Sequence, residues 1–195
     1  MERTLWITGI GGQGVQLCAK TLATAAIADG LEVAMFGSYG GEMRGGPTNA
    51  TVALGDRPLT SPPTVGRAWG VLAMHHDGWG ALATRVIAGG VVAIDTTVFR
   101  GDVDDTDVTV LPVPASAMAQ DLGSSQAGAM VALGALARAT GLVSLDSLVA
   151  ATEKVLPSYR ARFAEANATA VRAGFDSVPD VLVPAWPTSA MAGTS

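Results

Sequence analysis

Two glycine-rich segments carry the residues of this sequence that are best suited to chemistry. Residues 9–14 read Gly-Ile-Gly-Gly-Gln-Gly; a short apolar run that predicts a strand precedes them, and a helical pattern follows. Glycines spaced as G-x-G-x-x-G between a strand and a helix let backbone N–H groups approach a phosphate at the positive end of the helix dipole. We therefore predict a binding loop that contains Gly11, Gly12, Gln13 and Gly14.

The glycine spacing alone does not identify the ligand. A dinucleotide site also needs an acidic residue near the end of the second strand, where it holds the ribose. The second predicted strand ends in Phe36-Gly37-Ser38, and Glu32 lies at its start. This arrangement disfavours NAD and leaves two interpretations open. The glycines can serve a phosphate ligand, or they can simply let the helix pack closely on the sheet.

The second glycine-rich segment, residues 38–49, contains Tyr39, Glu42 and Arg44. An arginine suits a carboxylate or a phosphate because its planar guanidinium donates two parallel hydrogen bonds. Glu42 can instead pair with Arg44 locally, and Tyr39 can stack on a ligand or donate a hydrogen bond. We predict Tyr39, Glu42, Arg44 and Gly45 as binding residues. The alternative is a surface loop whose charges have no function.

A third cluster, His75-His76-Asp77, follows the predicted strand at residues 71–74. Open α/β sheets place functional loops at this end of a strand, so a catalytic base is conceivable here. A solvated pair of histidines is the favoured interpretation. Because no cysteine and no second carboxylate lies nearby in the sequence, we expect no metal site. We assign no catalytic residue.

Composition limits the class of protein. The chain has 195 residues, of which 49% are hydrophobic and 15% charged, and a net charge of −5. Such a chain forms one domain, and its excess of apolar residues suggests that other chains cover much of its surface. The basic residues are scattered, which argues against nucleic-acid binding. No apolar stretch is long enough for a membrane span, and no signal-peptide pattern is visible, so we expect a cytoplasmic protein.

Cys18 is the only cysteine in the sequence. One thiolate cannot hold an iron–sulfur cluster, and it cannot form a disulfide within the chain. Redox chemistry linked to this protein must therefore reside on another chain.

Hydrophobic periodicity predicts an α/β fold of the Rossmann-like kind: a mostly parallel sheet with flanking helices and a helical C-terminal third. The first strand, helix and second strand predict a parallel pair with a right-handed crossover. Residues 1–177 form the single predicted domain, and the proline-rich residues 178–195 form a tail or docking arm. We predict strands at 5–8, 31–36, 50–54, 71–74, 91–94 and 108–113, a loop at 37–49, and helices at 15–27, 78–87, 115–122, 126–139, 145–156 and 158–173.

The two glycine-rich segments, in this order, resemble the gamma subunit of 2-oxoacid:ferredoxin oxidoreductases. The form of the second segment is closer to the branched-chain 2-oxoacid and 2-oxoglutarate types than to the indolepyruvate type. The sequence differs from the family at Gly41, where proline is usual, and at His75-His76, where an Asn-Gln pair is usual. The similarity covers roughly residues 5–175, and its matching stretches are 11–15, 38–46, 48–52, 61–62, 71–74, 91–95, 129–135 and the residues Asn167, Ala170 and Gly174.

The resemblance implies a complex that oxidatively decarboxylates a 2-oxoacid, forms the acyl-coenzyme A thioester and passes two electrons to ferredoxin. Thiamine diphosphate then lies between the alpha and beta subunits, and iron–sulfur clusters lie on beta and delta subunits. The gamma subunit is expected to close the active-site cleft and help to bind coenzyme A, and to be inactive alone. Two alternatives remain: a stand-alone Rossmann-type nucleotide-binding protein, and a structural subunit whose glycines serve packing.

Overall fold

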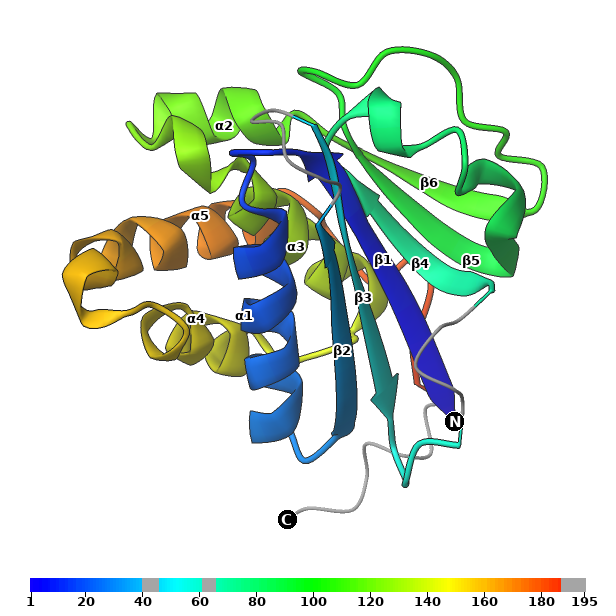
Figure 1. Cartoon of the computed structure of the whole chain (residues 1–195), viewed down its shortest axis with the longest axis horizontal. Helices are drawn as coiled ribbons and strands as arrows, with labels where there is room; N and C mark the ends of the chain where they lie inside the picture. The colour runs from blue at the N-terminus through cyan, green and yellow to red at the C-terminus, as the bar shows by residue number, and fades with distance from the viewer. Residues whose placement is uncertain (40–45, 61–65, 187–195) are drawn as a thin grey trace.

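The computed structural model of this protein describes residues 1–39, 46–60 and 66–186. Within these residues, six strands form one sheet in the order β2-β3-β1-β4-β5-β6 (Figure 1). The strands are β1 (Glu2–Ile10), β2 (Glu32–Tyr39), β3 (Pro47–Gly55), β4 (Ala68–Ala73), β5 (Val86–Asp95) and β6 (Val108–Val113). The α/β class predicted from the sequence is confirmed.

The sheet is mixed, because β3 runs against the other strands. β1, β4, β5 and β6 pair in parallel, whereas β3 pairs antiparallel with both β1 and β2. The predicted direct pairing of β1 with β2 is therefore wrong, although these two strands point the same way. The connection from Tyr39 to Pro47 is too short for a parallel crossover, so β3 must turn back beside β2, and it takes the place next to β1.

The helices form two layers on one face of the sheet (Figure 1). α1 (Val15–Ala28) and α3 (Gly128–Thr140) lie on the strands, and α4 (Leu145–Lys154) and α5 (Ala164–Asp176) pack outside them. The short α2 (Ala115–Asp121) packs against α3 near the carboxyl ends of the parallel strands. The main core lies between the sheet and α1 and α3, and its largest fully buried side chains include Leu5, Ile7, Leu22, Leu72, Met130 and Leu133.

A smaller core covers the opposite face of β1, β4 and β5. It is built from Trp6, Val71, Val92 and Phe99, with Trp79 against Phe99 at a ring-centroid distance of 6.3 Å. The connections from β4 to β5 and from β5 to β6 supply this cover. The chain moves from β1 toward one edge of the sheet to form β2, but from β4 toward the other edge to form β5 and β6. Because crossovers are right-handed, this reversal places the later connections on the face opposite α1.

The predicted helix at residues 78–87 is wrong. The structure has two short 3₁₀ turns, His76–Gly78 and Ala83–Arg85, and β5 already begins at Val86. Gly89 and Gly90, just after the predicted helix, lie inside β5, where a Cβ on Gly90 would come within 2.3 Å of a backbone oxygen. Trp79 and Leu82 both pack on the smaller core. Their spacing of three residues is also typical of one face of a helix, which is why the sequence predicted a helix here.

Two other predicted boundaries change. The predicted loop at 37–49 is partly strand, because β2 continues to Tyr39 and β3 begins at Pro47; residues 40–45 lie outside the described residues. The predicted helix at 158–173 starts as a 3₁₀ turn, Ser158–Phe163, and becomes α-helical at Ala164. The other predicted helices and strands are confirmed within a few residues of their ends.

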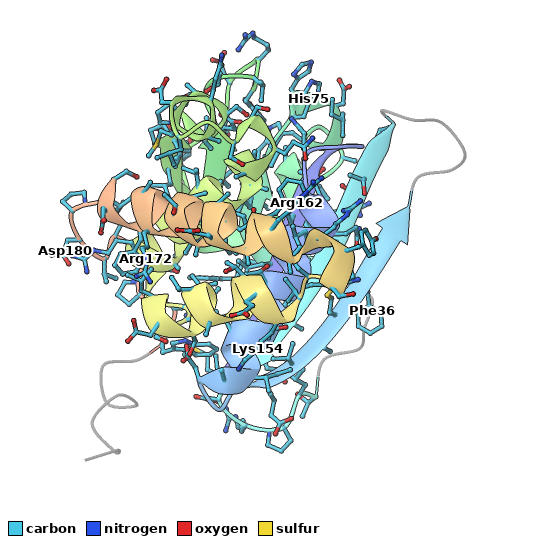
Figure 2. All side chains as sticks on the ribbon, turned by 90° about the vertical axis from the view of Figure 1, so that its left-hand side faces the viewer. Phe36, His75, Lys154, Arg162, Arg172 and Asp180 are labelled. Atoms are coloured by element: carbon cyan, nitrogen blue, oxygen red, sulfur yellow. The ribbon has the colours of Figure 1, made fainter. Side chains whose placement is uncertain are left out.

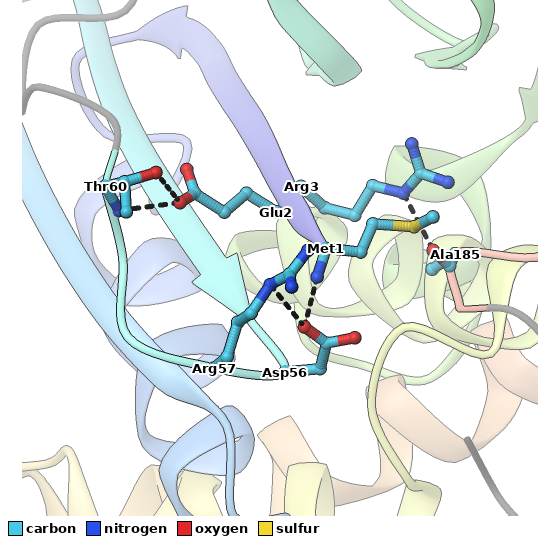
Figure 3. Close-up of polar contacts among 7 residues, drawn as sticks. All are labelled: Met1, Glu2, Arg3, Asp56, Arg57, Thr60 and Ala185. Carbon is cyan, nitrogen blue, oxygen red and sulfur yellow. Dashed lines mark hydrogen bonds and ion pairs between the residues drawn. The ribbon is translucent and has the colours of Figure 1, made fainter.

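Residues 178–186 lie against the rest of the chain. The N–H groups of Leu182 and Val183 donate to the carbonyl of Ala139, and Ala185 is fully buried. Figure 3 shows Arg3 at the start of β1 donating from Nε to the carbonyl of Ala185, over a distance of 2.7 Å. This part of the predicted tail is fastened to the domain, and the division at residue 177 stays a prediction.

α3 and α5 approach so closely that only glycine fits at their crossing. A Cβ on Gly134 would lie 2.0 Å from the carbonyl oxygen of Val171, and one on Gly174 would lie 1.9 Å from that of Val131. Backbone atoms of packed helices cannot move aside cheaply.

We predict that Gly174→Ala destabilises the fold by about 1–3 kcal/mol or more, because the added methyl group overpacks this crossing. Urea unfolding followed by circular dichroism measures the change as a lower midpoint. Gly80→Ala is the matched control, because nothing lies within 4 Å of a Cβ there. Equal midpoints for the two variants would show that the helices do not cross this closely.

Candidate functional site

The candidate site lies where the strand order reverses. From β1 the chain passes through α1 to β2 and β3 on one side of the sheet, and it then returns to β4, β5 and β6 on the other side. The carboxyl ends of the neighbouring strands β1 and β4 therefore form a topological switch point, where open α/β sheets bind ligands. The first glycine-rich loop follows β1, and His75 follows β4.

Positive φ angles shape the glycine-rich loop. Gly12 has φ 101° and Gly14 has φ 80°, and Gly14 caps the start of α1. Gly11 donates its N–H to the carbonyl of Gly46, over a distance of 3.0 Å. Since Gly46 immediately precedes β3, this bond joins the first glycine-rich segment to the end of the second. The N–H groups of Gly12 and Gly14 make no hydrogen bond within the described part of the chain.

The side chain of Gln13 closes the loop. Its Oε1 accepts a hydrogen bond from Ile10 N–H at 2.9 Å, and its Nε2 donates to the carbonyl of Met74 at 3.2 Å. The N–H of Met74 donates in turn to the carbonyl of Thr8. Gln13 thus ties the end of β1 to the end of β4, and both ends of its amide bond to backbone groups. Its contribution to a site is to position the backbone around it.

Gln16, which the sequence analysis did not single out, makes a comparable link. Its Nε2 donates to the carbonyl of Asn49 at 2.9 Å, and its Oε1 would lie 2.6 Å from a Cβ on Gly37. The first turn of α1 is thereby held against β2 and β3. No spacing rule relates a glutamine in a helix to a glycine in the strand that follows, so only the structure reveals this contact.

A groove of about 630 Å³ opens beside the glycine-rich loop. Gly12 and Gly14 form one wall, and the segment after α2 and the 3₁₀ turn before α5 form the others. The guanidinium of Arg160 lies 5.6 Å from the ring of Tyr159, and that of Arg162 lies 4.8 Å from the ring of Phe163. The remaining lining residues are Leu17, residues 123–126, Leu156 and Asn167.

These two arginines were missed by the sequence analysis. They fell in a predicted helix, about 150 residues from the glycine-rich loop, and no motif surrounds them. Figure 2 shows Arg162 and His75 on the same side of the molecule. Arginine over an aromatic ring is held in place while its N–H groups stay available to an anion. The groove therefore combines two glycines of the loop with two exposed arginines.

The second glycine-rich segment is only partly visible. Tyr39 is the last residue of β2 and pairs with Thr48 of β3. Glu42, Arg44 and Gly45 lie outside the described residues, so their part in the site stays a prediction. The strand pairing and the bond from Gly11 to Gly46 bring both ends of this segment to the carboxyl edge of the sheet.

Two other features carry no argument for a ligand. Asp95, fully buried at the end of β5, accepts hydrogen bonds from Thr97 N–H and from the N–H and hydroxyl groups of Ser116, so it is a structural link to α2. A second groove, of about 490 Å³, lies at the amino edge of the sheet. Its Asp29 accepts hydrogen bonds from Ser144 and Ser147, and its Arg138 donates hydrogen bonds to the carbonyl groups of residues 178 and 179. Both charged side chains therefore already bond within the protein.

Comparison with known proteins identifies the family. Residues 4–177 match the family model described as pyruvate ferredoxin/flavodoxin oxidoreductase. This chain belongs to that family. The family match and the relatives below make it a gamma subunit of a 2-oxoacid:ferredoxin oxidoreductase complex, as the two glycine-rich segments predicted. It is therefore a subunit of an oxidoreductase.

The relatives agree along nearly the whole chain. The 2-oxoglutarate synthase subunit KorC of Methanothermobacter marburgensis is 32% identical over 89% of this chain and 95% of its own length. The pyruvate synthase subunit PorC of Methanothermobacter thermautotrophicus is 31% identical over 90% of this chain and 95% of its own. The crystal structure of a keto/oxoacid ferredoxin oxidoreductase gamma subunit from Geobacter sulfurreducens, 26% identical, superposes with a TM-score of 0.77 over 90% and 95% of the two chains.

We predict that Gln13→Ala lowers the stability of the fold by about 1–2 kcal/mol, because it leaves Ile10 N–H and the carbonyl of Met74 without their partner. Urea unfolding of the purified chain measures this loss. Gln120→Ala is the control, since Gln120 is exposed on α2 and makes no side-chain hydrogen bond within the described residues. A Gln13→Ala midpoint equal to that of the control would remove Gln13 from the link between β1 and β4.

Proposed function

We propose that this gamma subunit binds coenzyme A in the groove beside its glycine-rich loop and closes the active site of a complex that converts a 2-oxoacid into an acyl-coenzyme A thioester. Thiamine diphosphate and the iron–sulfur clusters belong to partner subunits of the alpha, beta and delta types, which pass the electrons to ferredoxin. The supporting observation is that Gly12 and Gly14 of the glycine-rich loop line one groove together with Arg160 and Arg162.

The chemistry of the groove suits a phosphorylated ligand. The N–H groups of Gly12 and Gly14 lie at the N-terminus of α1, a helix of 14 residues whose dipole favours an anion there. Arg160 and Arg162 add full positive charges to a chain whose net charge is −5. Tyr159, 75% exposed, and Phe163 offer rings on which a purine can stack. A volume near 630 Å³ is typical of small-ligand sites.

The single cysteine supports a division of labour among subunits. Cys18 is fully buried, and burial raises the pKa of its thiol to about 12, so it stays protonated at neutral pH. A protonated, buried thiol is neither a cluster ligand nor a nucleophile. Electron transfer therefore has to occur on partner chains. The exposed apolar side chains of Ile27, Phe36 and Leu122 are candidates for contacts with those partners.

The proposal places the complex in the cytoplasm, where 2-oxoacids, coenzyme A and ferredoxin are present. None of the described helices is long and apolar enough to cross a bilayer.

We predict that replacing both Arg160 and Arg162 by alanine raises the KM of the assembled complex for coenzyme A by about tenfold or more, since each charged hydrogen bond contributes about 1.5–3 kcal/mol. Steady-state kinetics with varied coenzyme A measures the effect, and the KM for the 2-oxoacid should not change. Arg172→Ala is the control, because this exposed arginine of α5 does not line the groove. If the complex is intact and its KM for coenzyme A is unchanged, coenzyme A does not bind in this groove. The glycines would then serve packing.

We predict that Arg44→Ala in the complex also raises the KM for coenzyme A, by an amount that corresponds to about 1.5–3 kcal/mol if a charged hydrogen bond is lost. The same kinetic series, run separately for coenzyme A and for the 2-oxoacid, distinguishes a phosphate partner from a substrate carboxylate. Arg57→Ala serves as the control because Arg57 lies at the opposite end of β3, beside Asp56. Unchanged values for both substrates would exclude Arg44 from the site.

A further inference from the structure

A group of three side chains at the carboxyl edge of the sheet is not used by the proposed coenzyme A groove. His75, His76 and Asp77 follow β4 and bring one ligand atom each to within 4.8 Å of one another. His75 Nδ1 lies 3.4 Å from one carboxylate oxygen of Asp77, and His76 Nε2 lies 3.4 Å from the other. Their side chains are 18%, 40% and 54% exposed, so the group is open to solvent on one side.

The group gathers three side chains whose nitrogen and oxygen atoms can all bind a metal ion. His75 Nδ1 accepts a hydrogen bond from the backbone N–H of Asp77 at 3.2 Å. A metal ion bound to this nitrogen would take the place of that N–H, because the nitrogen has a single lone pair. The two imidazole rings are stacked with centroids 4.1 Å apart, which holds them side by side. A cation placed between the nitrogens and the carboxylate would contact all three side chains.

The spacing suits a transition-metal ion. Nitrogen and oxygen ligands at 2.0–2.2 Å from a tetrahedral Zn²⁺ are separated from each other by about 3.4 Å, which is the separation between the carboxylate oxygens and the two imidazole nitrogens. Imidazole with carboxylate selects ions such as Zn²⁺, Co²⁺ or Fe²⁺, whereas Mg²⁺ and Ca²⁺ prefer oxygen ligands alone. The open side leaves coordination positions for water or for an oxygen of another molecule.

A second set of polar atoms lies beneath the same turn. Three buried side-chain atoms have no hydrogen-bond partner within the described residues: Thr8 Oγ1, Asn49 Oδ1 and His76 Nδ1. Thr8 and Asn49 pair across β1 and β3, and a Cβ on Gly78 would lie 1.8 Å from Thr8 Oγ1, so the turn lies directly over this pair. A histidine that binds a metal through Nε2 turns its Nδ1–H to a buried acceptor, directly or through water. The orphaned oxygens supply such acceptors.

We propose that His75 Nδ1, His76 Nε2 and the carboxylate of Asp77 bind one divalent transition-metal ion of the Zn²⁺, Co²⁺ and Fe²⁺ class. The sequence analysis expected no metal here because it found no second carboxylate or cysteine nearby. The fold makes a second carboxylate unnecessary, because it turns Asp77 back onto both imidazoles. This site is separate from the coenzyme A groove and does not depend on the ligand proposed there.

The proposal is tested on the full-length chain, freed of any affinity tag and of metal by a chelator. We expect Co²⁺ to bind with one equivalent per chain and to give visible absorption bands typical of nitrogen and oxygen ligands, and Zn²⁺ to displace it. Because the chain has only two histidines, imidazole NMR signals that shift on binding belong to His75 and His76. Asp77→Asn and His76→Gln should each weaken binding by about tenfold or more.

Asp105→Asn is the matched control, since this exposed aspartate lies in an acidic loop away from the turn and should not affect binding. Circular dichroism of the metal-free variants checks the fold; if His76→Gln disturbs it, Asp77→Asn decides, because that side chain is more than half exposed. Any of three results would overturn the proposal: no stoichiometric binding of Co²⁺, equally strong binding of Mg²⁺, or unchanged binding in the Asp77→Asn variant. None of them bears on coenzyme A, which is absent from the experiment.

Discussion

The position of β1 between an antiparallel and a parallel neighbour is the constraint on which the rest of the structure depends. β3 pairs with β1 along its whole length, from Glu2 to Ile10, while β4 pairs with its other edge. The end of β1 consequently meets three segments at once: the start of β3, the end of β4 and the start of α1. Gln13 and Gln16 fix these junctions through one backbone N–H group and two backbone carbonyl groups, so the glycine-rich loop is held from several directions.

The same constraint explains how remote segments share one edge of the sheet. Because β3 returns beside β1, Gly46 reaches Gly11, and the second glycine-rich segment begins and ends next to the first. The connections after β4 cover the opposite face of the sheet. The face of α1 is thus left to the helices of the C-terminal third, which pack with α1 and bring the turn at Ser158–Phe163 beside the loop. As a result, Arg160 and Arg162 lie beside the glycine-rich loop, at the carboxyl edge of the sheet.

Local patterns in the sequence predicted the elements better than their arrangement. The strand at 108–113 and the helix stripe that starts at Val15 are confirmed, because their apolar spacing matches one face of a regular element. The α/β class and the family were also predictable, since the glycine-rich loop and the segment with Arg44 are short motifs. The insertion of β3 was not, because strand order depends on pairing between distant segments, which a periodicity does not encode.

The parts of the site that the sequence analysis missed share a physical cause. Arg160 and Arg162 become relevant only through the packing of α5 on α3, where Gly134 and Gly174 let the helices approach. His75, His76 and Asp77 were noticed but interpreted as a solvated pair of histidines, and a metal was not expected because no cysteine or second carboxylate lies nearby in the sequence. The 3₁₀ turn that begins at His76 brings the three side chains together. Gly78, at the end of this turn, lies against Thr8 of β1. The packing of the turn on β1 therefore brings the three polar side chains together, and no sequence motif indicates this cluster.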